Sequence, residues 1–125
     1  MLRNKDVTAT VGVRSLEKAR PFYEDVLGLT PEGEAEMGVQ TYRAGKTGFL
    51  VYESAFAGTN RATGLTWALG EDFDAVIEDL RAKGAAFERY DMEGAEHADG
   101  VHRIGGTKLA WIKDPDDNII HLGSF

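Results

Sequence analysis

One order of predicted elements occurs twice along the chain, and this repeat restricts the fold more than any other feature. Hydrophobic periodicity predicts a strand, a helix and several strands, followed by the same order again. The apolar helix faces begin at Leu16 and Phe73, 57 residues apart, and the glycines that end the helices, Gly28 and Gly84, are 56 residues apart. The sequence therefore predicts two similar halves.

These halves are predicted to form a single domain over residues 1–125, made of two modules at about 5–57 and 62–125. Each half, at roughly 60 residues, would bury only a marginal core by itself. No linker-like stretch separates the halves, and Gly58-Thr59-Asn60 is the best candidate for the crossing point.

The two predicted helices differ in regularity. The second has apolar residues at i, i+3, i+4 and i+7, namely Phe73, Val76, Ile77 and Leu80. The first is expected over Ser15–Leu27 and contains Pro21. Because proline in a helix interior costs roughly 3 kcal/mol, we expect a kink there or a new helical start with Pro21 in its first turn.

Alternating apolar residues predict the strands. They are expected at Val7–Val13, Val39–Arg43, Gly48–Tyr52, Thr66–Leu69, Ala85–Tyr90, Thr107–Lys113 and Ile119–Leu122, with Val101–Ile104 as a further candidate. The turn Asp114–Asn118 joins the last two strands into a hairpin, and Gly105-Gly106 indicates another hairpin turn. Met92–Gly100 is interpreted as a polar loop.

Charge and composition exclude several classes of protein. The chain has 14 Lys and Arg against 21 Asp and Glu, a net charge of −7, which disfavours a nucleic-acid partner. The absence of cysteine excludes disulfides, thiolate metal sites and a cysteine nucleophile. No apolar run approaches the roughly 18 residues of a membrane span, and no secretory signal is apparent. We therefore expect a cytoplasmic protein without a membrane partner.

Two segments carry a family resemblance. Val13–Leu29 resembles the opening strand and helix of the vicinal oxygen chelate superfamily, and Trp111–Leu122 resembles its closing hairpin, with Asp117 where the pattern usually has glycine. This superfamily includes glyoxalase I, extradiol dioxygenases and bleomycin-resistance proteins. The resemblance implies an α+β fold of two βαβββ modules that form a curled, cup-shaped mixed sheet with the helices outside. It also implies a homodimer.

In metal-dependent members of this superfamily, His and Glu side chains in the cup hold a divalent cation. Matching those positions to this chain gives Thr8, Gly64 or Leu65, a position near Val51, and His121. Only the His121 side chain would coordinate such a cation readily. We therefore expect a metal-independent protein with no cofactor.

A rebuilt metal site is the alternative. The chain has three histidines, His97, His102 and His121, and the first two lie near the acidic residues Glu93, Glu96 and Asp99. His102, His121 and one carboxylate would form such a site. His97, in the predicted polar loop, is expected to be solvated.

The expected pocket is apolar and aromatic with a few polar groups, as small-molecule pockets usually are. By resemblance and by strand alternation, its ligand-binding residues are Thr8, Thr10, Tyr52, Trp67, Leu109, Trp111, Ile119 and His121. Ordinary packing is the competing interpretation for Leu109, Trp111 and Ile119, and a hydrogen bond within the sheet is the competing one for His121.

We therefore predict a metal-independent protein of the glyoxalase and bleomycin-resistance type that binds a small apolar or aromatic molecule. The alternative is a glyoxalase-like lyase, isomerase or dioxygenase that uses a rebuilt metal site or His121 as a general base. No other catalytic residue is assigned, because no serine-nucleophile motif, phosphate-binding glycine loop or carboxylate pair is present. A structural or protein-interaction role, with the cup filled by side chains, is the third hypothesis.

Overall fold

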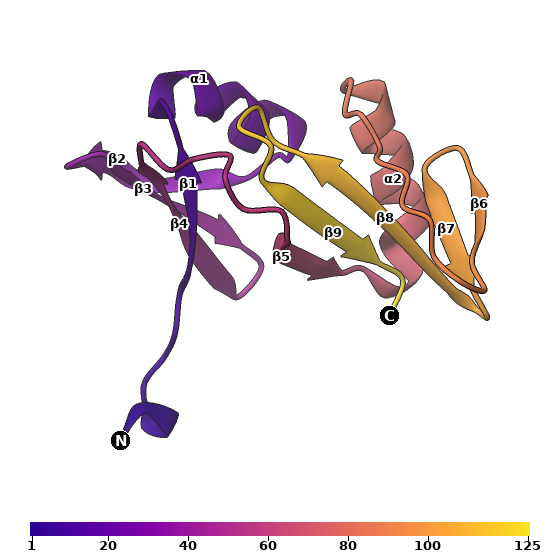
Figure 1. The fold of residues 1–125 in the computed structure, drawn as a ribbon. Coiled ribbons are helices and arrows are strands. Elements are labelled where there is room, and N and C mark those ends of the chain that lie inside the picture. The colour runs from indigo at the N-terminus through magenta and orange to yellow at the C-terminus, as the bar shows by residue number, and fades with distance from the viewer. The chain divides into compact units, whose positions relative to one another are not determined.

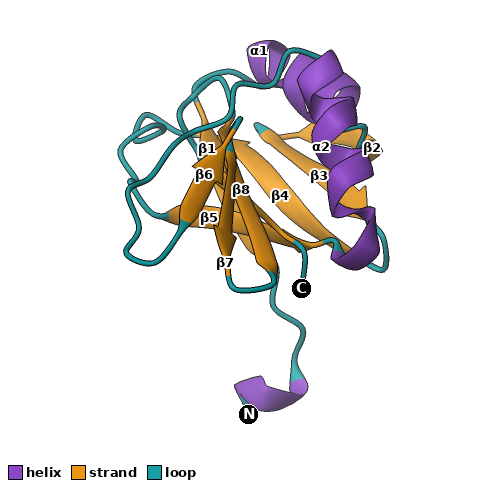
Figure 2. Ribbon diagram, turned by 90° about the vertical axis from the view of Figure 1, so that its right-hand side faces the viewer, coloured by secondary structure: helices purple, strands orange, loops and turns teal.

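The computed structural model describes all residues, 1–125, as an α+β protein with helices (purple in Figure 2) and two mixed sheets (orange). The chain divides into two compact units, Met1–Thr59 and Asn60–Phe125. Each unit has its own sheet, of four and of five strands, and neither sheet closes into a barrel (Figure 1). The units are described separately below.

The first unit contains a strand, a helical stretch and three further strands. Its elements are η1 (Leu2–Asn4), β1 (Ala9–Val13), α1 (Leu16–Arg20), η2 (Pro21–Val26), β2 (Thr30–Glu36), β3 (Val39–Ala44) and β4 (Thr47–Glu53). The strand order is β1-β4-β3-β2, with β1 parallel to β4 and the other pairs antiparallel. This is the predicted order of elements.

The first helical stretch changes character at Pro21. The side chain of Ser15 caps α1 by accepting a hydrogen bond from the backbone of Lys18. Pro21 then opens η2, a π-helical turn, in the first turn of a helix, where its missing N–H costs little. An irregularity at Pro21 was predicted as a kink or a new start; a π-helical turn begins there, while Arg20 and Pro21 both keep right-handed helical dihedrals and the stretch continues.

One face of the first sheet packs against this helical stretch. Tyr23 stacks on Tyr42 with ring centroids 5.6 Å apart and also contacts Phe49. The hydroxyl of Tyr42 donates a 3.0 Å hydrogen bond to Glu24 of η2. Val51 is fully buried and lies on this same face, because it alternates with Phe49 along β4.

The second unit has one strand more than the βαβββ module has. Its elements are β5 (Thr63–Ala68), η3 (Gly70–Asp72), α2 (Phe73–Ala82), β6 (Glu96–Ala98), β7 (Val101–Ile104), β8 (Thr107–Lys113) and β9 (Ile119–Gly123). The order β5-β9-β8-β7-β6 repeats the topology of the first sheet and adds β6 at one edge. As in the first unit, the first strand is parallel to the last one.

Helix α2 packs on the face of this sheet that includes Lys108, Ala110 and Ile112. Lys108 forms a 2.8 Å ion pair with Asp74 and lies 5.8 Å from the ring centroid of Phe73. Ala110 and Ile112 are fully buried, as are most of the predicted apolar residues of the helix. The opposite face carries the alternate residues of β8 and β9 and faces away from α2.

The predicted hairpin between β8 and β9 is present, and Asp114 organises it. The Asp114 carboxylate accepts hydrogen bonds from the backbone N–H groups of Asp116 and Asn118 and from the Asn118 side chain, at 2.7–2.9 Å. Asp117 has a φ of 65°, the left-handed conformation that glycine adopts more easily.

Three strand predictions need correction. Ala85–Tyr90 is not a strand and contributes only an isolated bridge between Phe87 and Ile112. Thr30–Glu36, where no strand was predicted, forms β2. Met92–Gly100 is not entirely a loop, because Glu96–Ala98 pairs with β7. In the last two cases, pairing with a neighbouring strand outweighs a polar local sequence.

Candidate functional site

The face of the second sheet that is turned away from α2 carries a row of rings. His97 of β6 pairs with His102 of β7, and Trp111 of β8 pairs with His121 of β9. Because directly paired residues share a face of a sheet, all four side chains lie on this side. Tyr90, from the segment that follows α2, and Phe125 add two further rings. We call these six residues the aromatic cluster.

Trp111 is at the centre of the aromatic cluster. Its indole stacks on His121 with centroids 4.8 Å apart and planes at 25°, and meets His102 and Tyr90 edge to face at 5.1 and 5.3 Å. These are favourable aromatic geometries. The neighbours therefore hold the indole in one orientation.

Four polar atoms of the aromatic cluster are buried without a hydrogen-bond partner: Tyr90 Oη, His97 Nε2, His102 Nδ1 and His121 Nε2. An unsatisfied buried polar group costs about 1–3 kcal/mol. Most buried polar side-chain atoms in native proteins are paired. Four such atoms in one cluster make it the candidate site of this unit.

The backbone fixes the protonation of His102. Its side chain is fully buried, and its Nε2 accepts a 3.0 Å hydrogen bond from the backbone N–H of Tyr90. An acceptor nitrogen carries no proton, so the neutral imidazole has its proton on Nδ1. The unpaired Nδ1 of His102 is therefore a hydrogen-bond donor.

His121 is less constrained. Its Nδ1 lies 3.4 Å from the hydroxyl of Thr66 on β5, and its Nε2 has no partner. Burial lowers the pKa of His121 below its ordinary value of 6.5. The imidazole is therefore neutral at pH 7, and Nε2 is available to donate or to accept a hydrogen bond.

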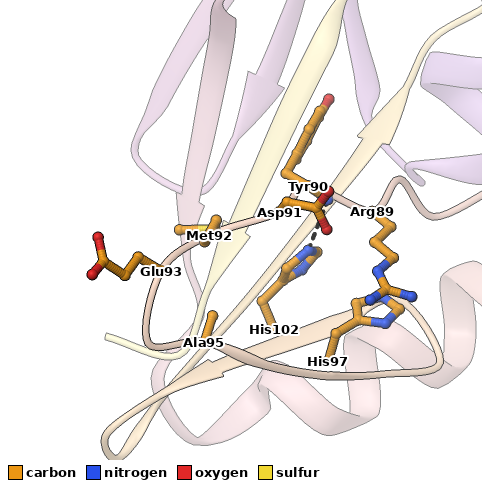
Figure 3. A pocket seen from close by; sticks show the side chains of 8 residues that line it. All are labelled: Arg89, Tyr90, Asp91, Met92, Glu93, Ala95, His97 and His102. Atoms are coloured by element: carbon orange, nitrogen blue, oxygen red, sulfur yellow. Dashed lines mark hydrogen bonds between the residues drawn. The ribbon is translucent and has the colours of Figure 1, made fainter.

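A pocket of about 310 Å³ adjoins the aromatic cluster (Figure 3). Its lining comes from the segment before β6 and from the β6 and β7 imidazoles: Arg89, Tyr90, Asp91, Met92, Glu93, Ala95, His97 and His102. The His97 side chain, expected to be solvated, is half-buried, and its Nε2 is buried. Burial, followed by the neighbouring His102 and Arg89, lowers the pKa of His97.

The structure brings together four of the eight residues predicted to bind a ligand. Leu109 and Trp111 share one face of β8, and Ile119 and His121 share the paired face of β9. Trp67 is on the other face, because it pairs with Leu122, which alternates with His121.

The other three predicted residues belong to the first unit. Thr10 is in β1 and Thr8 directly precedes it, while Tyr52 is in β4. Gly12 pairs with Tyr52, and Thr10 alternates with Gly12 along β1. Thr10 and Tyr52 therefore share a face, opposite the one that packs on α1 and η2.

The residues at the family's metal positions do not fit a divalent cation. Thr8, Val51, Gly64 and Leu65 offer no suitable donor, and Val51 faces the helices. No group of three or more His, Asp and Glu side chains is close enough to hold a metal ion. His102 also fits poorly, since Nε2 is bonded to Tyr90 and Nδ1 carries the proton. A metal requires an unprotonated nitrogen, so the rebuilt site lacks the necessary geometry.

Sequence reasoning missed Tyr90, Arg89 and Phe125 as site residues. Tyr90 was placed in a strand that does not form, and Arg89 precedes a stretch interpreted as a solvated loop. The aromatic character of Tyr90 and Phe125 was a usable signal, because aromatic side chains bury a large area when they pack.

Comparison with known proteins identifies the family. The sequence profile described as the Glyoxalase/Bleomycin resistance protein/Dioxygenase superfamily matches residues 7–122. The chain belongs to this superfamily. No curated protein sequence matches it, so membership in the Glyoxalase/Bleomycin resistance protein/Dioxygenase superfamily rests on the profile and the fold.

Solved structures of the same fold support this assignment. An integron cassette protein from the mobile metagenome of the Halifax Harbour sewage outfall has a TM-score of 0.69 and 14% identity, covering 97% of this chain and 99% of that one. Lactoylglutathione lyase from Agrobacterium tumefaciens has a TM-score of 0.66 and 15% sequence identity, and the match covers 95% of this chain and 92% of that one. The fosfomycin resistance protein FosX from Mesorhizobium loti has a TM-score of 0.67 and 14% sequence identity, and the match covers 97% of this chain and 92% of that one. At these identities the comparison shows a shared fold. The activities named for these proteins are not transferred to this chain.

None of the helices is both long and apolar enough to span a bilayer.

Proposed function

We propose that this protein binds a small, partly aromatic molecule on the aromatic cluster, without a metal ion. The observation that carries the proposal is the Trp111 indole, held by three neighbouring rings on a sheet face turned away from α2. A pre-oriented aromatic surface with a few unpaired polar atoms is the usual composition of a small-molecule site. Such a surface binds with little loss of side-chain entropy.

Leu109, Ile119 and His121 complete this proposed surface. Leu109 and Ile119 supply apolar contact beside Trp111, and the unpaired Nε2 of His121 supplies a polar contact that orients the ligand. Thr8, Thr10 and Tyr52 remain predicted ligand contacts from the first unit. We also propose that the protein is a homodimer and is located in the cytoplasm. Analytical ultracentrifugation tests the dimer.

The chain's two tryptophans provide a direct test. Trp67 and Trp111 lie on opposite faces of the same sheet, so single-tryptophan variants report on the two faces separately. Planar aromatic molecules that raise the Tm are titrated into Trp67→Phe and Trp111→Phe. We expect them to change the emission of Trp111 in Trp67→Phe and to leave the emission of Trp67 in Trp111→Phe unchanged. Stabilising molecules that change only Trp67, or neither, would contradict the proposal.

A second candidate function is a metal-free lyase or isomerase in which His121 is the general base. The neutral His121 imidazole with its unpaired Nε2 favours this candidate, since a general base must be unprotonated at working pH. It predicts that His121→Gln abolishes turnover, tested with lactoylglutathione, while ligand-induced stabilisation remains. Absence of lactoylglutathione turnover in the wild-type protein would count against this second candidate.

A further inference from the structure

The pocket beside the aromatic cluster has its own polar chemistry. Three of its lining residues carry buried atoms without a hydrogen-bond partner: Tyr90 Oη, His97 Nε2 and His102 Nδ1. Figure 3 shows the imidazoles of His97 and His102 side by side beneath the segment 89–95, with ring centroids 4.8 Å apart. The two imidazoles therefore place two unmet hydrogen-bonding atoms side by side, while the Tyr90 hydroxyl points away from them (Figure 3).

His102 determines what such a pocket accepts. The Tyr90 backbone N–H occupies Nε2, so the neutral ring presents an N–H at Nδ1. This fully buried donor needs an acceptor atom, and a metal ion does not provide one. An oxygen of a carbonyl or carboxylate does.

Charge favours the carboxylate over the neutral carbonyl. Arg89 lines the pocket, and its positive charge contributes to the lowered pKa of the His97 imidazole. The chain also places acidic residues here, Asp91 and Glu93. Glu93 points away from the two imidazoles (Figure 3), which leaves Asp91 in the lining and Asp99, whose charge acts to raise the pKa of His97, as the charges that oppose an anion.

We infer that this pocket binds the carboxylate end of a small organic molecule, with His102 Nδ1–H as the donor and Arg89 as the counter-charge. The inference rests on the proposed function, because Tyr90 and His102 both contact Trp111. An aromatic carboxylate then places its ring on the indole and its anionic group in the pocket.

The test uses NMR of the full-length protein with two probes of nearly the same shape, benzoate and benzylamine. Nitrogen-15 spectra resolve the Nδ1–H of His102 and the indole N–H groups, which are assigned with the single-tryptophan variants. We expect benzoate to shift both His102 Nδ1–H and the Trp111 indole, and benzylamine to leave His102 Nδ1–H unchanged.

Two charge variants on exposed lining residues serve as matched controls. Arg89→Gln is expected to weaken benzoate binding about threefold to fivefold, as loss of one exposed charge pair does. Asp91→Asn is expected to strengthen it, because it removes an opposing charge. Neither variant replaces an imidazole, although Arg89→Gln also removes a charge that lowers the pKa of His97.

The outcomes separate the two proposals. If the probes shift the Trp111 indole while His102 Nδ1–H never responds, the carboxylate inference is wrong and the proposed function stands. Equal responses of His102 to benzoate and benzylamine, or insensitivity of benzoate binding to both charge variants, also overturn the inference. If no aromatic probe shifts Trp111, both proposals fail.

Discussion

The indole of Trp111 stacks on the imidazole of His121, at 4.8 Å between ring centroids, from directly paired positions on β8 and β9. This pair joins a large apolar surface to a neutral imidazole with an unpaired nitrogen. It differs from the usual site of the Glyoxalase/Bleomycin resistance protein/Dioxygenase superfamily, where His and Glu side chains hold a cation. In this chain the residue paired with His121 is Trp111, whose ring is aromatic and binds no cation.

Replacing Trp111 tests whether this surface binds or merely packs. Trp111→Ala is expected to abolish stabilisation by aromatic probes and to lower the free energy of unfolding by about 2 kcal/mol, less than a fully buried tryptophan costs because the ring is half-buried. Trp67→Ala, on the opposite face, is the control and is expected to destabilise without loss of binding. Circular dichroism and thermal shifts measure both effects. Unchanged probe affinity in Trp111→Ala would show that the ring only packs.

The His121 pKa predicts a pH dependence of stability. Burial lowers this pKa in the folded state below 6.5, so the unfolded chain takes up the proton first as the pH falls. The free energy of unfolding should therefore be fully retained above pH 6.5 and should decrease as the pH falls below it.

His121→Gln isolates this contribution from those of the carboxylates. Urea denaturation at pH 7 and pH 5 gives the loss in the free energy of unfolding between the two pH values, for the wild type and for His121→Gln. The loss is expected to be smaller in His121→Gln. Because His97 has a pKa shifted in the same direction, His97→Gln serves as a parallel comparison. An equal or steeper loss in His121→Gln would contradict the buried, neutral imidazole.

The β8–β9 hairpin offers a pair of opposite predictions. Asp114→Ala removes the acceptor for three hydrogen bonds and is expected to cost about 2–3 kcal/mol. Asp117→Gly relieves a residue held at a φ of 65° and is expected to stabilise by up to roughly 1 kcal/mol. Chemical denaturation measures both. Destabilisation by Asp117→Gly would indicate that this side chain has a role beyond the turn.

Gly100 positions the two imidazoles of the pocket, because it forms the turn between β6 and β7. It has a φ of +83°, and a Cβ there would overlap the side chain of Phe87. Gly100→Ala is therefore expected to destabilise by more than about 2 kcal/mol. Gly94→Ala is the control: its φ is +78° with nothing within 4 Å, so only backbone strain of about 1 kcal/mol applies. Equal costs would show that the contact with Phe87 is unimportant.

Periodicity predicted the parts of the fold that obey a simple pattern. The apolar spacing of Phe73, Ile77 and Leu80 gave α2, and the Asp114–Asn118 turn gave the last hairpin, because both depend on residues close in sequence. β6 and β2 were missed because their polar sequences pair only when a neighbouring strand is already in place. The error at Ala85–Tyr90 has the same origin: one bridge to Ile112 is a tertiary contact with no local signal.

The candidate site was predictable only in part, for a similar reason. Strand alternation placed Leu109, Trp111, Ile119 and His121 on one face. It could not find Tyr90, whose ring and backbone N–H reach His102 across 12 positions of the sequence. That hydrogen bond determines the tautomer of His102, and thereby the chemistry of the pocket.

The central claim is that the ligand binds without a metal ion, and calorimetric titration of an aromatic carboxylate into the protein tests it most directly. The titration compares EDTA-treated protein with the same protein supplemented with Zn²⁺, Ni²⁺, Mn²⁺ or Fe²⁺, after elemental analysis of both. The account predicts the same Kd in all samples and no stoichiometric metal after purification. Binding that disappears with EDTA and returns with one of these ions would contradict it.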